Sequence, residues 1–226
     1  MKLGALFSGG KDSTYALFKA MKEHKVVCLI SLRSLNPESY MFHIPAFEII
    51  SQQAEALGIP LILVETKGEK EKELVDLKKA IEKAVSEFGI QGIVTGAVAS
   101  EYQRSRIAKI CDELNLKCVN PLWGMDQIEL LKEMVENKFK IIVVGVAAYP
   151  LEEEWLGREI DLKTIEELEG LQKKYKINPA GEGGEFETMV LDSPIHKKKI
   201  KLLKVRKEFS EGSGVLKIIE IKSVKK

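Results

Sequence analysis

The chain has 226 residues, of which 45% are hydrophobic and 31% are charged. This balance excludes disordered and collagen-like proteins, and the length suits one domain with a smaller appendage. The 35 basic and 34 acidic residues give a formal net charge of +1, so direct binding of nucleic acid is not expected. The longest apolar run, around residues 141–151, is too short to span a bilayer, and the N-terminus lacks a signal-peptide core. We therefore expect a soluble, cytoplasmic protein without a membrane partner.

The three cysteines are an odd number and form no C-x-x-C spacing, which argues against a disulfide framework and against a structural zinc site. Cys28 lies in an apolar run typical of a strand, and Cys111 falls on the apolar face of a helix. Both are expected to be buried as small hydrophobic residues in a reducing compartment. The environment of Cys118 stays open.

Residues 1–150 alternate short β-rich runs with amphipathic helical patterns. This alternation predicts βαβ units and therefore an α/β fold, a Rossmann-like parallel sheet with helices on both faces. The predicted strands are Leu3–Phe7, Val26–Leu32, Leu61–Glu65, Gly92–Thr95, Lys117–Val119 and Ile141–Val146.

The pattern changes after Tyr149-Pro150. An acidic run at 152–154 leads to a predicted helix over 161–175, and β-like segments follow near 189–191, 199–207 and 215–221. The sequence therefore predicts a nucleotide-binding domain over 1–150 and a smaller α+β region over 151–226.

A glycine-containing loop follows the first predicted strand and precedes a helix, with the sequence Ser8-Gly9-Gly10-Lys11-Asp12-Ser13. Paired glycines let backbone N–H groups turn inward, and the helix adds its unpaired N–H groups and the positive end of its dipole. The loop is therefore predicted to bind an anion. Its spacing matches neither the Walker A motif nor the dinucleotide fingerprint.

The hexapeptide resembles the pyrophosphate-binding loop of the N-type ATP pyrophosphatases, which split ATP between the α and β phosphates. This resemblance implies an adenine nucleotide alpha hydrolase-like fold, with Ser8, Gly9, Gly10 and Ser13 holding the pyrophosphate portion of ATP. It also implies that Asp12 helps to position Mg²⁺. Lys11 occupies the variable position, where it could assist the phosphates or simply face solvent.

Three further segments, Ser39–His43, Ser100–Arg106 and Gly181–Thr188, narrow the resemblance. Together with the loop they resemble the diphthine–ammonia ligase family. The resemblance implies ATP-dependent amidation of diphthine on translation elongation factor 2, giving diphthamide, AMP and pyrophosphate. Ammonium is the expected nitrogen donor, because no region is large enough for a glutaminase and no cysteine has the setting of a nucleophile.

Arg104 and Arg106 open a helix after the fourth predicted strand, where ligands bind in parallel sheets. Arginine is disfavoured near a helix N-terminus by the dipole, and its fork suits phosphate or carboxylate. On this mismatch together with the resemblance, both are candidate catalytic residues, and the alternative is that they lie on a solvated first turn. The resemblance adds Gln103 to the nucleotide site.

The segment Gly181–Thr188 places three glutamates around a glycine pair. Glu185 and Glu187 are candidate catalytic residues, and alternation in an extended segment is expected to point both to one side. They could meet Mg²⁺ or the trimethylammonium group of diphthine, with an aromatic face such as Trp123, although core packing better explains each aromatic residue alone. The resemblance implies a substrate-binding set made of Tyr40, His43, Tyr102, Glu182, Gly183, Gly184, Phe186 and Thr188.

Several alternatives stay open. His43 could equally be a loop histidine whose ring is hydrogen-bonded to a backbone carbonyl. Lys197–Lys199, beside His196, could simply belong to a charged edge strand. A tRNA-modifying enzyme of the thiolation type and a sensor that binds ATP or AMP without turnover are the rival functions. Whether the chain forms a homo-oligomer is not decided by the sequence.

Overall fold

A computed structural model describes residues 1–34, 47–66 and 72–226. The chain divides into two compact units, Met1–Trp123 and Gly124–Lys226. Residues 124–150, which the sequence assigned to the first domain, therefore group with the second unit. No helix in these described ranges is long and apolar enough to span a membrane.

The first unit contains a five-stranded parallel sheet with the strand order β3-β2-β1-β4-β5. This order belongs to doubly wound α/β folds, so the predicted fold class is confirmed. The strands are β1 (Lys2–Leu6), β2 (Lys25–Ser34), β3 (Leu61–Thr66), β4 (Gly92–Val94) and β5 (Lys117–Val119).

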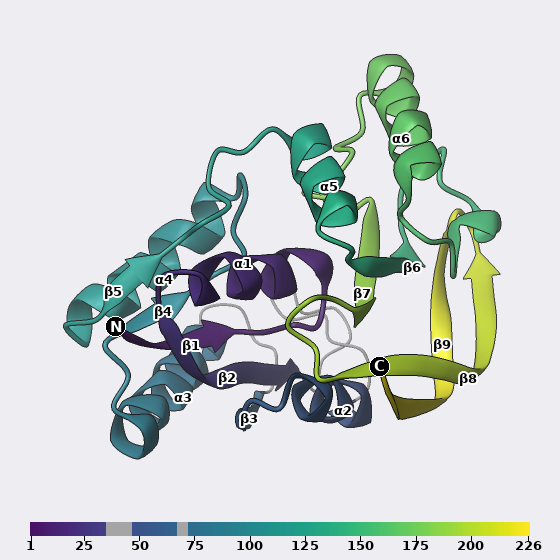
Figure 1. The fold of residues 1–226 in the computed structure, drawn as a ribbon. Helices are drawn as coiled ribbons and strands as arrows, with labels where there is room; N and C mark the ends of the chain where they lie inside the picture. Colours follow the sequence, from purple (N-terminus) through teal and green to yellow (C-terminus); the bar gives the residue numbers. More distant parts are fainter. Residues whose placement is uncertain (35–46, 67–71) are drawn as a thin grey trace. The chain divides into compact units, whose positions relative to one another are not determined.

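Helices cover both faces of this sheet (Figure 1). The helices of the unit are α1 (Lys11–Met21), α2 (Phe47–Leu57), α3 (Lys72–Phe88) and α4 (Glu101–Glu113). Side chains of α3 and α4, such as Ile81 and Ile107, form one buried cluster with Cys28 and Ile30 of β2. Helix α1 contacts β1, β2 and β4 without joining that cluster, so it covers the opposite face.

The chain reverses its direction of travel across the sheet between β1 and β4, which are hydrogen-bonded neighbours. In open parallel sheets, ligands bind beyond the carboxyl ends of the strands at such a switch point. The loops 7–10 and 95–100 leave β1 and β4 at that edge and lead into α1 and α4. The topology therefore places the predicted anion loop and the predicted arginine helix at one end of one sheet.

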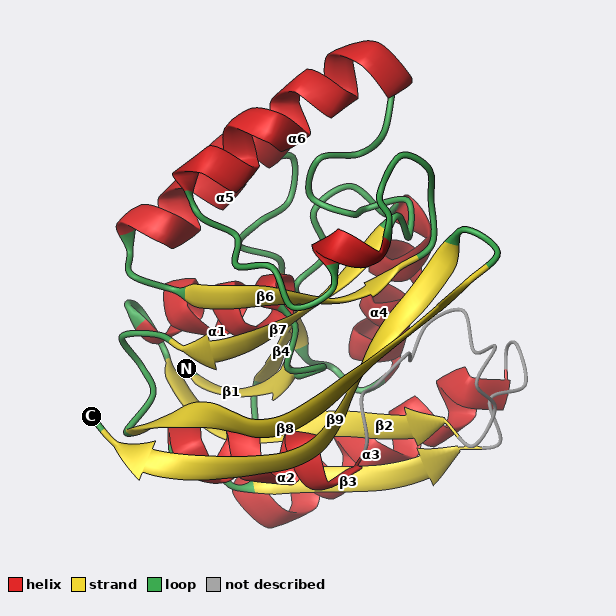
Figure 2. Ribbon diagram, turned by 90° about the vertical axis from the view of Figure 1, so that its right-hand side faces the viewer, coloured by secondary structure: helices red, strands yellow, loops and turns green. Residues whose placement is uncertain are grey.

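The second unit is built on a four-stranded antiparallel sheet with the order β7-β6-β9-β8. Its two C-terminal strands form a long two-stranded ribbon (Figure 2). The strands are β6 (Lys140–Val146), β7 (Phe186–Asp192), β8 (Lys198–Ser210) and β9 (Ser213–Lys225), and the helices are α5 (Gln127–Glu136), η1 (Glu153–Trp155) and α6 (Leu162–Tyr175).

The sequence assigned residues 141–146 to the parallel sheet, and this was wrong. The segment is β6, which pairs antiparallel with both β7 and β9. All residues of β6 after Lys140 are buried, so its apolar run does not alternate. A strand that is buried on both faces has the same continuous apolar sequence in a parallel and in an antiparallel sheet, so its sequence does not reveal its direction.

Local signals in the sequence are confirmed at several helix ends. The Asp126 side chain accepts hydrogen bonds from the backbone N–H groups of Ile128 and Glu129, which caps α5. Asp161 caps α6 in the same way. The expected burial of Cys28 and Cys111 is also confirmed, and both thiols are free.

His196 is buried in the second unit, with 4% of its surface exposed. Its Nδ1 lies 2.6 Å from the Ser193 hydroxyl, and its Nε2 has no hydrogen-bond partner among the described residues. Burial lowers the pKa of His196 to about 4 from an ordinary value of 6.5. The imidazole is therefore neutral in the folded protein at pH 7.

We predict that acidification weakens the second unit through His196. Unfolding lets this side chain take up a proton between pH 6.5 and 4, so the free energy of unfolding falls across that window as the pH is lowered. The loss should be about 2–3 kcal/mol larger in the wild type than in His196→Asn, which does not titrate. Urea titrations at several pH values, followed by the fluorescence of the buried Trp155, measure it. Parallel pH profiles for the two proteins would contradict the prediction.

Candidate functional site

The turn from β1 into α1 depends on the backbone of Gly9. Its φ of 76° lies in the left-handed region, and a Cβ at this position would come within 1.9 Å of Gln53 Oε1. The Gln53 side-chain amide also donates a hydrogen bond of 2.9 Å to the Gly9 carbonyl. Glycine is thus required both by conformation and by the close approach of α2.

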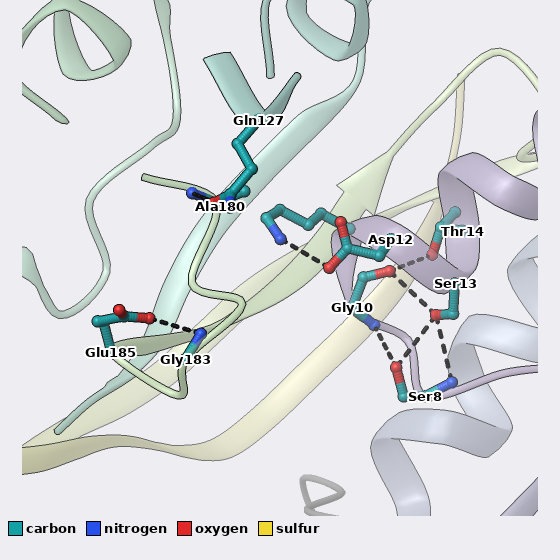
Figure 3. A network of polar contacts seen from close by, with 10 residues as sticks. Ser8, Gly10, Asp12, Ser13, Thr14, Gln127, Ala180, Gly183 and Glu185 are labelled. Carbon is teal, nitrogen blue, oxygen red and sulfur yellow. Dashed lines mark hydrogen bonds and ion pairs between the residues drawn. The ribbon is translucent and has the colours of Figure 1, made fainter. Parts of the chain in front are cut away.

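Hydroxyl groups link the two ends of the loop (Figure 3). The Ser8 and Ser13 hydroxyls lie 3.1 Å apart, and the Ser13 hydroxyl also donates to the Gly10 carbonyl at 3.1 Å. The Thr14 hydroxyl donates to the same carbonyl at 2.8 Å. These bonds fix the loop in a tight curve around the start of α1.

Gly10 is the N-cap of α1 and supplies no side chain to the first turn of the helix. Most helices satisfy these first N–H groups with a Ser, Thr, Asp or Asn side chain at this position. A cap without a side chain leaves the positive end of the helix dipole accessible to an external anion. The local geometry therefore agrees with the predicted anion loop.

Lys11 and Asp12 form an ion pair with Nζ and Oδ2 2.6 Å apart. Only 3% of Lys11 is exposed, so the alternative that this lysine faces solvent was wrong. The second carboxylate oxygen, Asp12 Oδ1, is buried and has no hydrogen-bond partner among the residues that the structure describes. A buried carboxylate oxygen of this kind is costly unless a donor or a cation completes it.

Gly96, which the sequence did not single out, follows β4 and packs against the start of α1. A Cβ at Gly96 would lie 2.7 Å from the Ser13 backbone nitrogen. Thr95, the residue before it, donates from its hydroxyl to Asn120 Oδ1 at 2.6 Å. Only a glycine at 96 lets the end of β4 come so close to the loop, and no spacing rule in the sequence signals this contact.

The two arginines of α4 are held by aromatic rings. The Arg104 guanidinium lies 4.3 Å from the centre of the Trp123 ring and bonds Glu101 through Nε at 3.0 Å. The Arg106 guanidinium lies 3.5 Å from the centre of the Tyr102 ring. Both contacts are cation–π interactions, and the helix itself is capped by the Ser100 hydroxyl.

Cys118 of β5 has a more active setting than the sequence indicated. A hydrogen bond from the Cys111 thiol is the main cause that lowers the pKa of Cys118 to about 7, and the Asn120 amide donates to its sulfur at 3.3 Å. The environment of Cys118, which the sequence left open, thus favours its thiolate more than that of an ordinary cysteine.

The glutamate loop of the second unit is organised by Glu185. This side chain is 8% exposed, and its carboxylate accepts hydrogen bonds from the Asn178 backbone, the Asn178 side chain and the Gly183 backbone at 2.7–2.8 Å. A Cβ at Gly183 would lie 2.7 Å from Glu185 Oε1. The same loop is tied to α5, because Gln127 accepts from the Ala180 backbone at 3.0 Å (Figure 3).

The remaining members of the glutamate loop differ in exposure. Glu187 is exposed on β7 opposite Gly145, and Glu182 is half-buried. Phe186 is buried, in line with the expectation that core packing explains the aromatic residues. Glu185 and Glu187 therefore differ in environment, although the sequence treated them as a matched pair.

Other predicted site residues lie in different parts of the chain. Tyr102, Gln103 and Trp123 are half-buried in the first unit, and Thr188 and Gly184 belong to the second. Tyr40 and His43 lie outside the described residues.

We predict that Glu185→Gln destabilises the second unit. In glutamine, an NH₂ group replaces one of the two carboxylate oxygens that now accept hydrogen bonds from N–H groups. An NH₂ group cannot accept these bonds, so at least one hydrogen bond is lost, at a cost of roughly 1–3 kcal/mol. Chemical denaturation of the variant beside Glu166→Gln, an exposed glutamate of α6, measures the difference. Equal stability of the two variants would show that the carboxylate does not hold the loop together.

The amino-acid sequence matches two family profiles. Residues 1–118 match the profile described as diphthamide synthase N-terminal domain, and residues 126–224 match the diphthamide synthase C-terminal domain. The division between the two compact units, at Trp123 and Gly124, falls between these two matches.

Two curated relatives carry the name diphthine–ammonia ligase. Diphthine–ammonia ligase of Mus musculus is 35% identical over 227 residues, which cover 88% of this chain and 82% of the mouse protein. The Schizosaccharomyces pombe protein of that name is 32% identical over 99% of this chain and 39% of its own length. A solved structure described as a predicted subunit of tRNA methyltransferase from Methanocaldococcus jannaschii aligns at a TM-score of 0.44 and 17% identity, covering 86% of this chain and 98% of that one.

Both halves of the chain thus match the two domains of one family in the order of that family, and the mouse relative is matched over more than two thirds of its length. The chain belongs to the diphthamide synthase family.

Proposed function

We propose that this protein is an ATP-dependent ligase that amidates the diphthine carboxylate of translation elongation factor 2 with ammonium. The products are diphthamide, AMP and pyrophosphate. Membership of the diphthamide synthase family supports this reaction, as does the name diphthine–ammonia ligase carried by the relatives. The cytoplasm is the compartment where such a substrate would be met.

The observation that carries the proposal is the loop from Ser8 to Ser13 at the switch point of the parallel sheet. Its left-handed Gly9, its cap without a side chain and its linked hydroxyls suit a pyrophosphate group. We assign the polyphosphate of ATP to Ser8, Gly9, Gly10, Lys11 and Ser13, with Gln103 as a further contact from α4. Ammonia cannot displace oxide from a carboxylate, so the carboxylate must first be given a better leaving group. The transfer of AMP from ATP to a carboxylate oxygen makes AMP that leaving group.

Asp12 fits a role in holding Mg²⁺. Its Oδ1 is buried and lacks a hydrogen-bond partner among the described residues, and Mg²⁺ in nucleotide sites is held by one or two carboxylates together with phosphate oxygens. No cluster of three metal-binding side chains occurs in the described ranges, so the phosphates would have to supply the other ligands. When bound, Mg²⁺ would neutralise the charge that develops on the leaving pyrophosphate.

Arg104 and Arg106 are assigned to the negative charge at the reacting end of the nucleotide. The rings of Trp123 and Tyr102 restrict the rotamers of the two guanidinium groups before substrate arrives, and such restriction reduces the entropy lost on binding. Glu101 keeps Arg104 neutralised in the absence of an anion. A phosphate could take the place of that carboxylate in the same bidentate geometry.

The glutamate loop is assigned to the acceptor substrate. Glu187 is the exposed carboxylate that suits a cation, either Mg²⁺ or the trimethylammonium group of diphthine, whereas Glu185 acts as a positioning residue through its bonds within the loop. The other residues proposed to bind the acceptor are Tyr40, His43 and Tyr102 in the first unit and Glu182, Gly183, Gly184, Phe186 and Thr188 in the second.

Binding of ATP should depend on the Ser13 hydroxyl. We predict that Ser13→Ala weakens ATP binding by roughly 1–3 kcal/mol, because the hydroxyl that orders the Ser8 end of the loop and faces the phosphates is lost. Isothermal titration calorimetry with ATP and Mg²⁺ measures the change. Ser86→Ala, on the exposed face of α3, is the matched control, and unchanged affinity in Ser13→Ala would refute the assignment of this loop.

The position of ATP cleavage is the sharpest test of the proposed reaction. We predict AMP and pyrophosphate in equal amounts with the amidated factor when ATP, ammonium and diphthine-bearing elongation factor 2 are combined. Chromatography of the nucleotides and mass spectrometry of the factor provide the measurement, with unmodified factor as the control. The proposal would be refuted if the products were ADP and phosphate, or if AMP were released at the same rate with unmodified factor as with diphthine-bearing factor.

A further inference from the structure

The ribbon formed by β8 and β9, residues 198–225, concentrates positive charge and is named here the basic hairpin. It contains nine lysines or arginines and three glutamates, a net charge of +6, whereas the whole chain has a net charge of +1. The other residues together are therefore acidic. This concentration of positive charge in one structural element produces a local electrostatic field that the near-neutral net charge of the whole chain does not reveal.

The strand register places some of these charges directly opposite one another. Lys201 pairs with Lys222 across the two strands, and Lys198 pairs with Lys225. Like charges at directly opposite positions of an antiparallel pair are destabilising, and Lys201 and Lys222 are both exposed. Stability of the hairpin does not account for this arrangement.

The same hairpin exposes aliphatic side chains in its middle. Register shifts flank Lys204 and leave Leu203 and Ile219 outside the paired positions, and these two side chains are 48% and 54% exposed. Val205 and Val215 are also exposed. β-Bulges redirect side chains in this way, so Leu203 and Ile219 are exposed aliphatic side chains among lysines. Val215 pairs with Glu208 and therefore lies on the face of the ribbon opposite to Val205.

Protection against edge-to-edge pairing explains only part of this pattern. Strand β8 lies at the edge of its sheet, as the sequence indicated for Lys197–Lys199, and lysines are common on such edges. Edge protection, however, disfavours exposed aliphatic residues, which promote association. Aliphatic side chains surrounded by charged ones are instead the composition of a protein-binding surface with an apolar centre and a polar rim.

We propose that the basic hairpin is the docking surface for the protein substrate, and that it binds an acidic face of that substrate with an apolar centre. The proposal rests on the proposed function, since it deepens the assignment of a protein as acceptor. Nucleic acid is the less favoured partner, because Phe209 is the hairpin's one aromatic residue and is half-buried, so unpaired bases find no exposed stacking platform.

The test is the double variant Lys201→Gln, Lys222→Gln in the full-length protein. We expect KM for diphthine-bearing elongation factor 2 to rise by about tenfold with kcat unchanged, because the two lost charges belong to the proposed docking surface and neither is assigned to the reaction itself. The melting temperature should not fall, since a like-charge pair is removed. A merely structural role for these lysines predicts the opposite combination, a lower melting temperature and unchanged KM.

The matched control is Lys138→Gln, Lys163→Gln, which removes the same charge from two exposed positions of the same unit outside the hairpin. It should leave KM within about twofold of the wild type. Raising the ionic strength should increase KM more for the wild type than for the hairpin variant, because screening acts on the charges that the variant lacks.

Binding is also measured without turnover, by fluorescence anisotropy of the labelled modified factor. If the wild type forms no AMP with the factor, the proposed function fails, while the anisotropy titrations still compare the hairpin variant with its control. Equal affinity and equal KM for the two double variants would overturn the docking surface. Weaker binding of a single-stranded RNA by the hairpin variant, with unchanged affinity for the factor, would overturn it as well.

Discussion

Close backbone approach at the switch point of the parallel sheet is the constraint on which the candidate site depends. Gly9 turns left-handed beneath Gln53, and Gly96 lets the end of β4 reach the Ser13 nitrogen. Both contacts exclude a Cβ, so the loop and the first turn of α1 are held between Gln53 of α2 and the end of β4. A helix end fixed in this way has its dipole aimed before any ligand arrives, and such preorganisation reduces the cost of binding an anion.

The two units solve the problem of buried charge differently. In the first, Lys11 compensates one oxygen of Asp12 and leaves the other oxygen for an external partner. In the second, the backbone and side-chain N–H groups around Glu185 compensate both of its oxygens. One carboxylate is incomplete without a ligand, whereas the other completes its own loop, and this difference separates a binding group from a positioning group.

Much of the fold and part of the site could be predicted from the sequence. The alternation of β-rich runs with helical patterns predicted the five strands of the parallel sheet, and the hexapeptide Ser8–Ser13 predicted the anion loop. Both signals are local properties of the chain. The orientation of β6 could not be predicted, since a strand buried on both faces has no alternation to read. Gly96 and Gln53 were missed because their roles come from contacts between segments that are distant in the sequence. The burial of Glu185 was missed because one of its hydrogen-bond donors, Asn178, lies outside the predicted motif.

The Lys11–Asp12 pair balances the charges of the loop in the absence of a ligand, although Asp12 Oδ1 still lacks a hydrogen-bond partner among the described residues. Neither charge is buried alone, so the empty site avoids the large cost of an uncompensated ion. A polyphosphate and a divalent cation arriving together would let the pair exchange partners, with the ammonium turning to the anion and the carboxylate to the cation. Exchange of this kind would keep the summed charge of the loop and its ligands balanced, and the proposed site would then favour the metal–nucleotide complex over either component alone.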